Sequence, residues 1–132
     1  MRGFRLPMLE YEEDSLDIRD QIVMDPDNTF YMLMSSNDMA GFGIFKDNIL
    51  VIDRSLEPIN SAIVVAYFRG EFYTRQYIRQ GKSVQLKGDN EAATLLVEPD
   101  EELKVWGVVT VTLNRVLPDA LRKGRYQDVC TC

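Results

Sequence analysis

The sequence predicts a mostly-β fold, a single domain built as a coiled sheet or sandwich with one short N-terminal helix. Short segments rich in Val, Ile and aromatic residues recur at intervals of about 8–12 residues, with turn residues between them. Along residues 72–79 the side chains form two alternating sets, which is typical of a strand. A length of 132 residues suits one domain with one core.

The predicted elements follow one another along the chain with turn signals between them. Asp14 or Ser15 can cap a short helix that ends near Val23. Residues 25–28, Asp-Pro-Asp-Asn, favour a turn. Seven strands are expected after that turn, at residues 29–34, 49–52, 62–68, 72–79, 83–86, 94–97 and 105–113.

These elements divide the chain into an N-terminal arm at residues 1–13, a folded domain at 14–117 and a flexible C-terminal tail at 118–132. The strand at 105–113 is long and β-branched and would attract another strand if it lay at an edge, so we expect a homodimer. The expected core residues are Phe30, Leu33, Ile49, Val51, Ile63, Val65, Val84, Leu86, Val105 and Val108.

Composition narrows the function classes. The net charge of −6 disfavours strong direct binding to nucleic acid, because phosphate contacts supply most of that affinity. No apolar run reaches the length of a membrane helix, so no membrane contact and a cytoplasmic location are expected. Cys130 and Cys132 supply two soft ligands where structural zinc needs four, and the chain has no histidine. We therefore expect no metal and no cofactor.

One segment carries the most specific signal. Residues 35–39 read Ser-Ser-Asn-Asp-Met and precede Gly43 and an apolar strand that ends at Asp53. This segment resembles the nucleophile segment of the LexA/UmuD family of self-cleaving Ser-Lys peptidases, where Ser-Gly-Asp-Ser-Met carries the attacking serine before the Met. Asp38 stands at the position of that serine.

A second segment resembles the strand that carries the family's catalytic lysine. Gly70-Glu71-Phe72 matches a Gly-Glu-Phe of the UmuD branch, and Arg75 stands where the lysine follows. Further matches in the same order are found at residues 7–11, 16–18, 84–86 and 105–109. The resemblance covers most of the chain and implies the fold of the LexA/UmuD C-terminal domain.

The resemblance also implies a lost activity. In the family a serine attacks the chain's own peptide bond and a neutral lysine accepts its proton. Arginine stays protonated and cannot be that base, so we expect a pseudo-peptidase in which Asp38 and Arg75 form an ion pair of about 2.7–2.9 Å. Recruiting Ser35 or Ser36 would need a shifted register, and Lys82 lies beyond the next turn.

Residues 1–4, Met-Arg-Gly-Phe, resemble the start of the processed form UmuD′. The resemblance implies a homodimeric accessory subunit of a UmuC-like translesion polymerase in the SOS response, with the recombinase filament as a further partner. Three alternatives stay open. The chain could form regulatory mixed dimers with an active UmuD- or LexA-like protein, could be an active self-cleaving peptidase, or could reuse the β-domain in an unrelated interaction.

Overall fold

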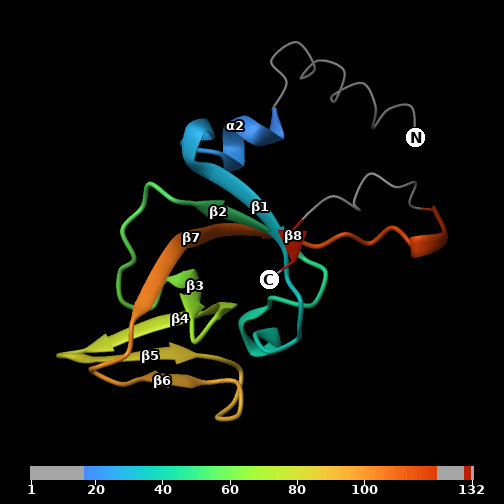
Figure 1. The fold of residues 1–132 in the computed structure, drawn as a ribbon. Coiled ribbons are helices and arrows are strands. Elements are labelled where there is room, and N and C mark those ends of the chain that lie inside the picture. The colour runs from blue at the N-terminus through green and yellow to red at the C-terminus, as the bar shows by residue number, and fades with distance from the viewer. Residues whose placement is uncertain (1–16, 122–129, 132) are drawn as a thin grey trace, which may run out of the picture.

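The computed structural model describes residues 17–121 and 130–131, which form one eight-stranded sheet (Figure 1). The strand order is β6-β5-β4-β3-β7-β2-β1-β8, and every neighbouring pair is antiparallel except β1 and β8. The strands are β1 Thr29–Leu33, β2 Ile49–Asp53, β3 Ile63–Phe68, β4 Glu71–Gln80, β5 Ser83–Lys87, β6 Leu95–Val97, β7 Leu103–Leu113 and β8 Cys130–Thr131. The mostly-β fold class is confirmed.

The seven strands expected from the sequence are all present, with each end within two residues of its predicted position. Local turn chemistry explains this agreement. Arg69 and Gly70 form the two-residue loop between Phe68 and Glu71, and both have positive φ, 52° and 83°. Such loops match the twist of an antiparallel pair, and glycine adopts this backbone conformation without strain.

The short helix α2 spans Ile18–Ile22 and is capped by Asp17, whose carboxylate accepts a hydrogen bond of 2.9 Å from the backbone N–H of Arg19. The caps expected at Asp14 and Ser15, like the arm at residues 1–13, lie outside the described residues. In the part of the chain that the structure describes, none of the helices has the length and apolar character needed to cross a membrane.

Strand β7 stands between β3 and β2 in the strand order, but its two halves have different partners. Residues 103–108 pair with β3, and residues 108–113 pair with β2. In the described pairings, residues 109–113 therefore have a neighbouring strand on the β2 side alone. Because this half of β7 keeps one open ladder of backbone groups, the dimer expected from a β7 edge stays a prediction.

Two residues of the expected tail belong to the sheet. Cys130 and Thr131 form β8, which pairs parallel with Met32 and Leu33 of β1. This differs from the prediction that the whole of residues 118–132 lies outside the fold. Such a pairing depends on contacts between distant parts of the chain, and no local pattern in the sequence signals it.

The core consists of two clusters. One gathers Met34, Met39, Ile44, Leu50, Ile52 and Val65, and the other gathers Val64, Ala66, Phe68, Tyr77 and Leu86. Since neighbouring β3 residues belong to different clusters, and successive strand side chains point to opposite faces, the clusters occupy opposite faces of the sheet. Among the ten expected core residues, Val51, Val65 and Leu86 are fully buried and six others are partly buried.

Phe30 is the exception among the expected core residues, since 40% of its surface is exposed. The segment with Met34, Met39 and Ile44 covers Leu50 and Ile52 of β2. Phe30 instead packs against the ring of Trp106 in an edge-to-face contact, with the ring centroids 5.3 Å apart. Its aromatic character alone wrongly suggested burial.

Candidate functional site

The loop that carries Asp38 connects β1 to β2 and is fixed at both ends. Met34 and Met39 flank it and are fully buried. The backbone N–H of Met34 donates to the Asn48 carbonyl at 2.9 Å, and the N–H of Asp47 donates to the Met34 carbonyl at 2.8 Å. Buried anchors and backbone bonds of this kind hold a loop in one conformation. Asp38 is therefore presented from a fixed loop.

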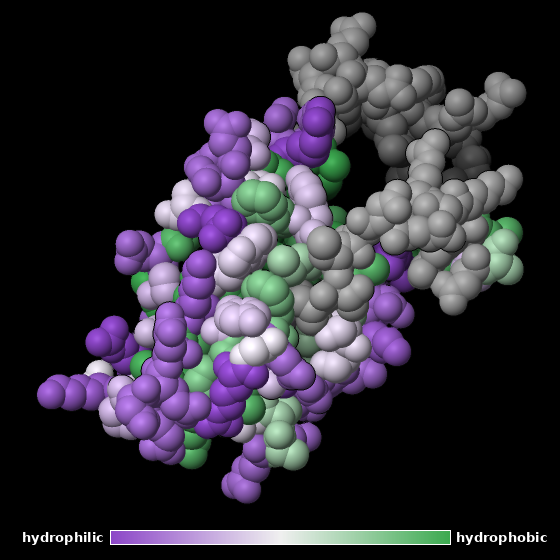
Figure 2. Space-filling view, viewed as in Figure 1, coloured by the Kyte–Doolittle hydropathy of each residue, from purple (hydrophilic) through white to green (hydrophobic). Residues whose placement is uncertain are grey.

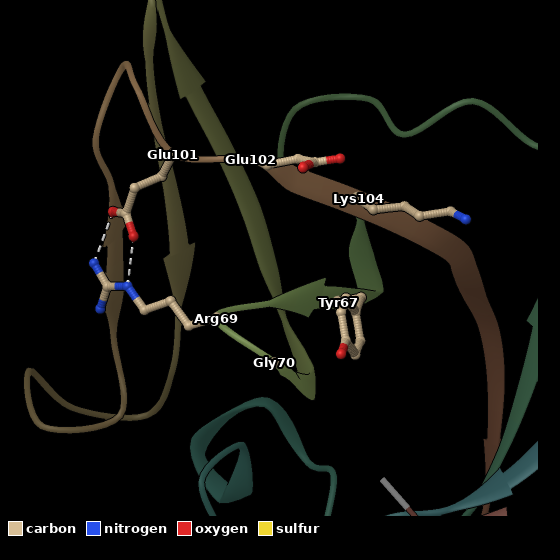
Figure 3. A pocket seen from close by; sticks show the side chains of 6 residues that line it. All are labelled: Tyr67, Arg69, Gly70, Glu101, Glu102 and Lys104. Atoms are coloured by element: carbon tan, nitrogen blue, oxygen red, sulfur yellow. Dashed lines mark hydrogen bonds and ion pairs between the residues drawn. The ribbon is translucent and has the colours of Figure 1, made fainter.

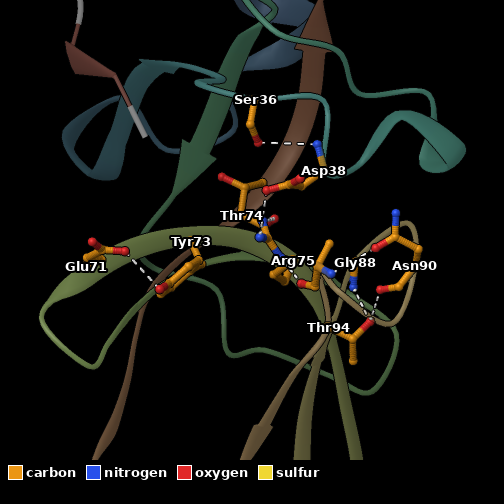
Figure 4. A network of polar contacts seen from close by, with 10 residues as sticks. Ser36, Asp38, Glu71, Tyr73, Thr74, Arg75, Gly88, Asn90 and Thr94 are labelled. Carbon is orange, nitrogen blue, oxygen red and sulfur yellow. Dashed lines mark hydrogen bonds and ion pairs between the residues drawn. The ribbon is translucent and has the colours of Figure 1, made fainter.

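Arg75 lies in the middle of β4, and its side chain extends toward Asp38 (Figure 4). It is almost completely buried. Its Nε donates to the Ala93 carbonyl at 2.7 Å, and its Nη1 donates to the Thr74 carbonyl at 2.9 Å. Its Nη2 donates to Oδ2 of Asp38 at 3.1 Å. Each nitrogen of the guanidinium thus has an acceptor, which satisfies a cation that would otherwise be costly to bury.

A third segment, residues 88–94, completes the site. The backbone N–H of Asp89 donates to the carbonyl of Asp38 at 2.7 Å. Thr94 Oγ1 accepts from the N–H of Gly88 at 3.1 Å and donates to the carbonyl of Asn90 at 2.8 Å. A methyl group on Gly88 would lie 2.7 Å from the Ala93 carbonyl oxygen, so glycine allows this close approach. Arg75 and Asp89 together fasten the Asp38 loop to this segment.

The ion pair expected between Asp38 and Arg75 is present, at a distance slightly above the expected range. The two side chains are unequally buried, with 6% of Arg75 and 49% of Asp38 exposed. Tyr73 also contacts the guanidinium, whose Cζ lies 5.3 Å from its ring centroid. Tyr73 donates to Glu71 at 2.9 Å, and that hydrogen bond to a carboxylate raises the pKa of the phenol.

The other candidates from the sequence lie at different places. Ser36 Oγ accepts a hydrogen bond of 3.3 Å from the backbone N–H of Asp38, and Ser35 is exposed. Lys82 lies in the β4–β5 turn, beyond Gln80 and so more than roughly 16 Å along the strand from Arg75. Asp53 is a strand-end acid, as expected, and accepts from the backbone N–H of Ser55 at 2.7 Å.

The chemistry of the site follows from these contacts. A guanidinium has only donors and stays protonated, so Arg75 can hold a carboxylate but cannot accept a proton. The Asp38 carboxylate is the acceptor of the pair. In residues 17–121 and 130–131, no group of three His, Cys, Asp or Glu side chains could hold a metal ion. Sequence reasoning missed the part played by residues 88–94, whose contacts with Asp38 and Arg75 join distant parts of the chain.

Two of the surface cavities among the described residues lie near the β3–β4 turn and near the Asp38 loop. One, of about 530 Å³, is lined by Tyr67, Arg69, Gly70, Glu101, Glu102 and Lys104 near the β3–β4 turn (Figure 3). Within it Arg69 binds Glu101 through two contacts of 2.7 and 2.8 Å, which lower the pKa of Glu101 to about 2. The other, of about 500 Å³, includes Gly88 and Asp89 in its lining and so adjoins the Asp38 loop.

Comparison with known proteins places this site in a family. Residues 2–110 match the sequence model of the family described as Peptidase S24-like. The chain belongs to this family. Its S24-like relatives include Protein MucA of Salmonella typhimurium, 30% identical over 112 residues that cover 84% of this chain and 77% of MucA. Protein SamA of Salmonella typhimurium is 28% identical over 113 residues, 86% of this chain and 79% of SamA.

The LexA repressor of Clostridioides difficile is a more partial S24-like match, 29% identical over 84 residues that cover 63% of this chain and 40% of the repressor. The family match spans both segments singled out in the sequence, the loop with Asp38 and the strand with Arg75. The resemblance to the LexA/UmuD family is thus confirmed at the level of family and fold.

Proposed function

We propose that this chain is a non-cleaving, UmuD′-like member of the S24-like family that acts by binding. It would form a homodimer and serve as accessory subunit of a UmuC-like translesion polymerase in the SOS response to DNA damage. The observation that carries the proposal is the buried Arg75, ion-paired to Asp38 at 3.1 Å.

The contacts of Arg75 support a binding role over a catalytic one. A serine–lysine peptidase needs a lysine that can be neutral and take up a proton. The guanidinium of Arg75 remains charged and has its Nε, Nη1 and Nη2 engaged with three acceptors. Asp38 and Arg75 therefore hold the loop of residues 35–42 against β4 and residues 88–94, in a fixed surface suited to a partner.

The relatives support the particular kind of partner. The UmuD-like proteins MucA, SamA and ImpA align with 84–86% of this chain, whereas the LexA repressor aligns with 63%. This coverage favours the accessory-subunit reading over a repressor-like one. The net charge of −6 points the same way, because recruitment to damaged DNA would then depend on a protein partner.

The test is complementation in a bacterial host that lacks its own UmuD. The chain is expressed with the cognate UmuC-like polymerase, and damage-induced mutagenesis is measured together with co-purification of the polymerase. We expect rescue and co-purification of the intact chain. A chain that is cleaved supports the active peptidase, while failure of both rescue and co-purification overturns the proposal. Inhibited cleavage of a co-expressed UmuD or LexA would then identify the mixed-dimer regulator.

A further inference from the structure

The strand at one end of the sheet, β6, has an open side. It spans Leu95–Val97 and, among the described strands, pairs with β5 alone. Leu96, its middle residue, is apolar and has 62% of its surface exposed. The open side of an edge strand is a template on which another strand can add, so soluble proteins cover or charge such edges. The contacts on this side of β6 therefore decide what the edge can bind.

Backbone groups on the open side of β6 are already engaged within the chain. The carbonyl of Leu96 accepts from Nη2 of Arg69 at 3.3 Å, and the N–H of Glu98 donates to Oε1 of Glu101 at 3.1 Å. Leu96 and Glu98 are two positions apart, and backbone groups at that spacing in an antiparallel strand point to the same side. Since neither Arg69 nor Glu101 belongs to β5, that side is the open one. An incoming strand would need the same carbonyl and N–H for its own ladder.

The side chain of Arg69 is held across this edge by further contacts. Its Nε and Nη2 bind the Glu101 carboxylate at 2.7 and 2.8 Å, and Figure 3 shows the two side chains pointing toward each other. Its Cζ lies 4.5 Å from the ring centroid of Phe68, which is fully buried. The planar guanidinium presents several donors in a fixed geometry, so it binds the carboxylate and the Leu96 carbonyl together.

Glu101 engages the next outward position of the edge. Its backbone N–H donates to the Glu98 carbonyl at 3.0 Å, in addition to the bond between its carboxylate and the Glu98 N–H. One residue therefore occupies both backbone groups of Glu98. Because the same carboxylate anchors Arg69, the contacts at Leu96 and at Glu98 depend on each other.

We propose that Arg69 and Glu101, which we call the edge cover, keep β6 from pairing with β6 of a second copy of this chain. Two identical edge strands can pair antiparallel about a two-fold axis, because each offers the other the same backbone groups. The surface around β5 and β6 carries mostly hydrophilic side chains with hydrophobic ones scattered among them (Figure 2). The backbone edge, and not an apolar patch, is thus the feature on which a copy would add.

Sedimentation velocity of the full chain tests the proposal by comparing wild type with Arg69→Ala/Glu101→Ala. This double variant removes both halves of the edge cover and leaves the net charge at −6. We expect particles of at least twice the wild-type mass at about 100 µM protein and about 0.5 M NaCl, which screens the exposed carboxylates that follow β6. The comparison is with wild type at the same concentration, so it holds whether wild type is a monomer or a dimer.

Hydrogen exchange locates the new contact. Amide hydrogens in residues 94–98 should exchange about tenfold or more slowly in the larger particles than in the diluted, dissociated variant, because strand pairing gives them new partners. Leu96→Lys, added to the double variant, places a charge on the edge and should return the mass to that of wild type. Leu56→Lys, the same change at an exposed residue of the β2–β3 loop, should not.

A second pair of substitutions controls for the loss of an ion pair as such. Arg19 and Asp17 also form an exposed arginine–carboxylate pair, at 3.3 Å, but they lie at α2 and away from β6. Arg19→Ala/Asp17→Ala again leaves the net charge unchanged and should keep the wild-type mass. Thermal melting of each variant reports whether it is folded.

Two results would overturn the edge cover. One is a folded Arg69→Ala/Glu101→Ala variant that keeps the wild-type mass, and the other is association that Leu96→Lys leaves unchanged, which would place the contact on another surface. If the double variant does not fold, Arg69→Met takes its place and is judged by the same two results. It keeps the aliphatic stem of residue 69 beside Phe68 and removes the donor to the Leu96 carbonyl.

Discussion

Arg75 and Asp38 are joined by one contact of 3.1 Å, but the two side chains differ in how deeply they are buried. Arg75 is buried and has two further acceptors, the carbonyls of Ala93 and Thr74, whereas Asp38 keeps about half of its surface in solvent. Removing a buried, fully bonded charge is costly because its partners lose their bonds. Losing the half-exposed Asp38 carboxylate costs less, because water can reach that side of the pair and Arg75 keeps its two carbonyl acceptors.

Replacing the two residues should therefore have unequal effects on stability. Arg75→Ala should lower the free energy of unfolding by about 2–4 kcal/mol, since it leaves buried carbonyls without a donor. Asp38→Asn should lower it by less, about 1–2 kcal/mol, because the buried cation loses its carboxylate while the amide oxygen can still accept from Nη2. Urea denaturation measures both, and Arg79→Ala, an exposed change on the same strand, should stay within about 0.5 kcal/mol of wild type. Equal losses for Arg75→Ala and Asp38→Asn would contradict this account.

Gly88→Ala should disturb the same site through the backbone. Its methyl group would lie 2.6 Å from the Cβ and 2.7 Å from the carbonyl oxygen of Ala93, the oxygen that binds Arg75. We expect a loss of about 1–3 kcal/mol, the usual cost of overpacking. In a double-mutant cycle, the double variant Gly88→Ala/Arg75→Ala should lose less stability than the two single variants lose together, because both changes act on one contact. Strict additivity would show that the two act separately.

The fold was largely predictable because its signals are local. Alternating side chains and turns such as Arg69-Gly70 set the strand boundaries, and they can be recognised within a few residues. The Asp38–Arg75 ion pair was also predictable, although from the family resemblance and not from a local pattern, because the two residues are 37 positions apart in the sequence.

The features that the sequence did not reveal are non-local. The place of β7 between β3 and β2, and the pairing of β8 with β1, depend on strand order, which no single segment encodes. Phe30 is partly exposed because the β1–β2 loop, with Met39 and Ile44, packs on Leu50 and Ile52 of β2 and leaves the Phe30 side chain partly uncovered. Ala93 accepts from Arg75, and the N–H of Asp89 donates to Asp38. Both contacts join distant parts of the chain, so the local sequence of residues 88–94 does not predict them.

Restoring the serine alone should not restore a reactive nucleophile. In Asp38→Ser the neighbouring Arg75 stays protonated even at pH 10, so no base can accept the hydroxyl proton. A fluorophosphonate probe, which labels activated serines, should react with Asp38→Ser/Arg75→Lys much faster than with Asp38→Ser at pH 10, where a lysine can be neutral. Equal labelling of the single and double variants, both shown by circular dichroism to be folded, would refute this role of Arg75.

The ion pair between Arg69 and Glu101 should make stability depend on pH in the acid range. The two contacts with Arg69 lower the pKa of Glu101 from its ordinary value of 4.5 to about 2. A carboxyl whose folded pKa is depressed adds stability that is fully present above pH 4.5 and is lost as the pH falls toward 2.

Glu101→Gln removes this titration, so its melting temperature should lie below that of wild type at pH 6, and the difference should shrink steadily between pH 4.5 and pH 2. Glu102→Gln, a neighbouring carboxylate without a bond to Arg69 among the described contacts, serves as control and should show no such change in this window. A constant difference between Glu101→Gln and wild type across the window would show that the pair does not depress the pKa of Glu101.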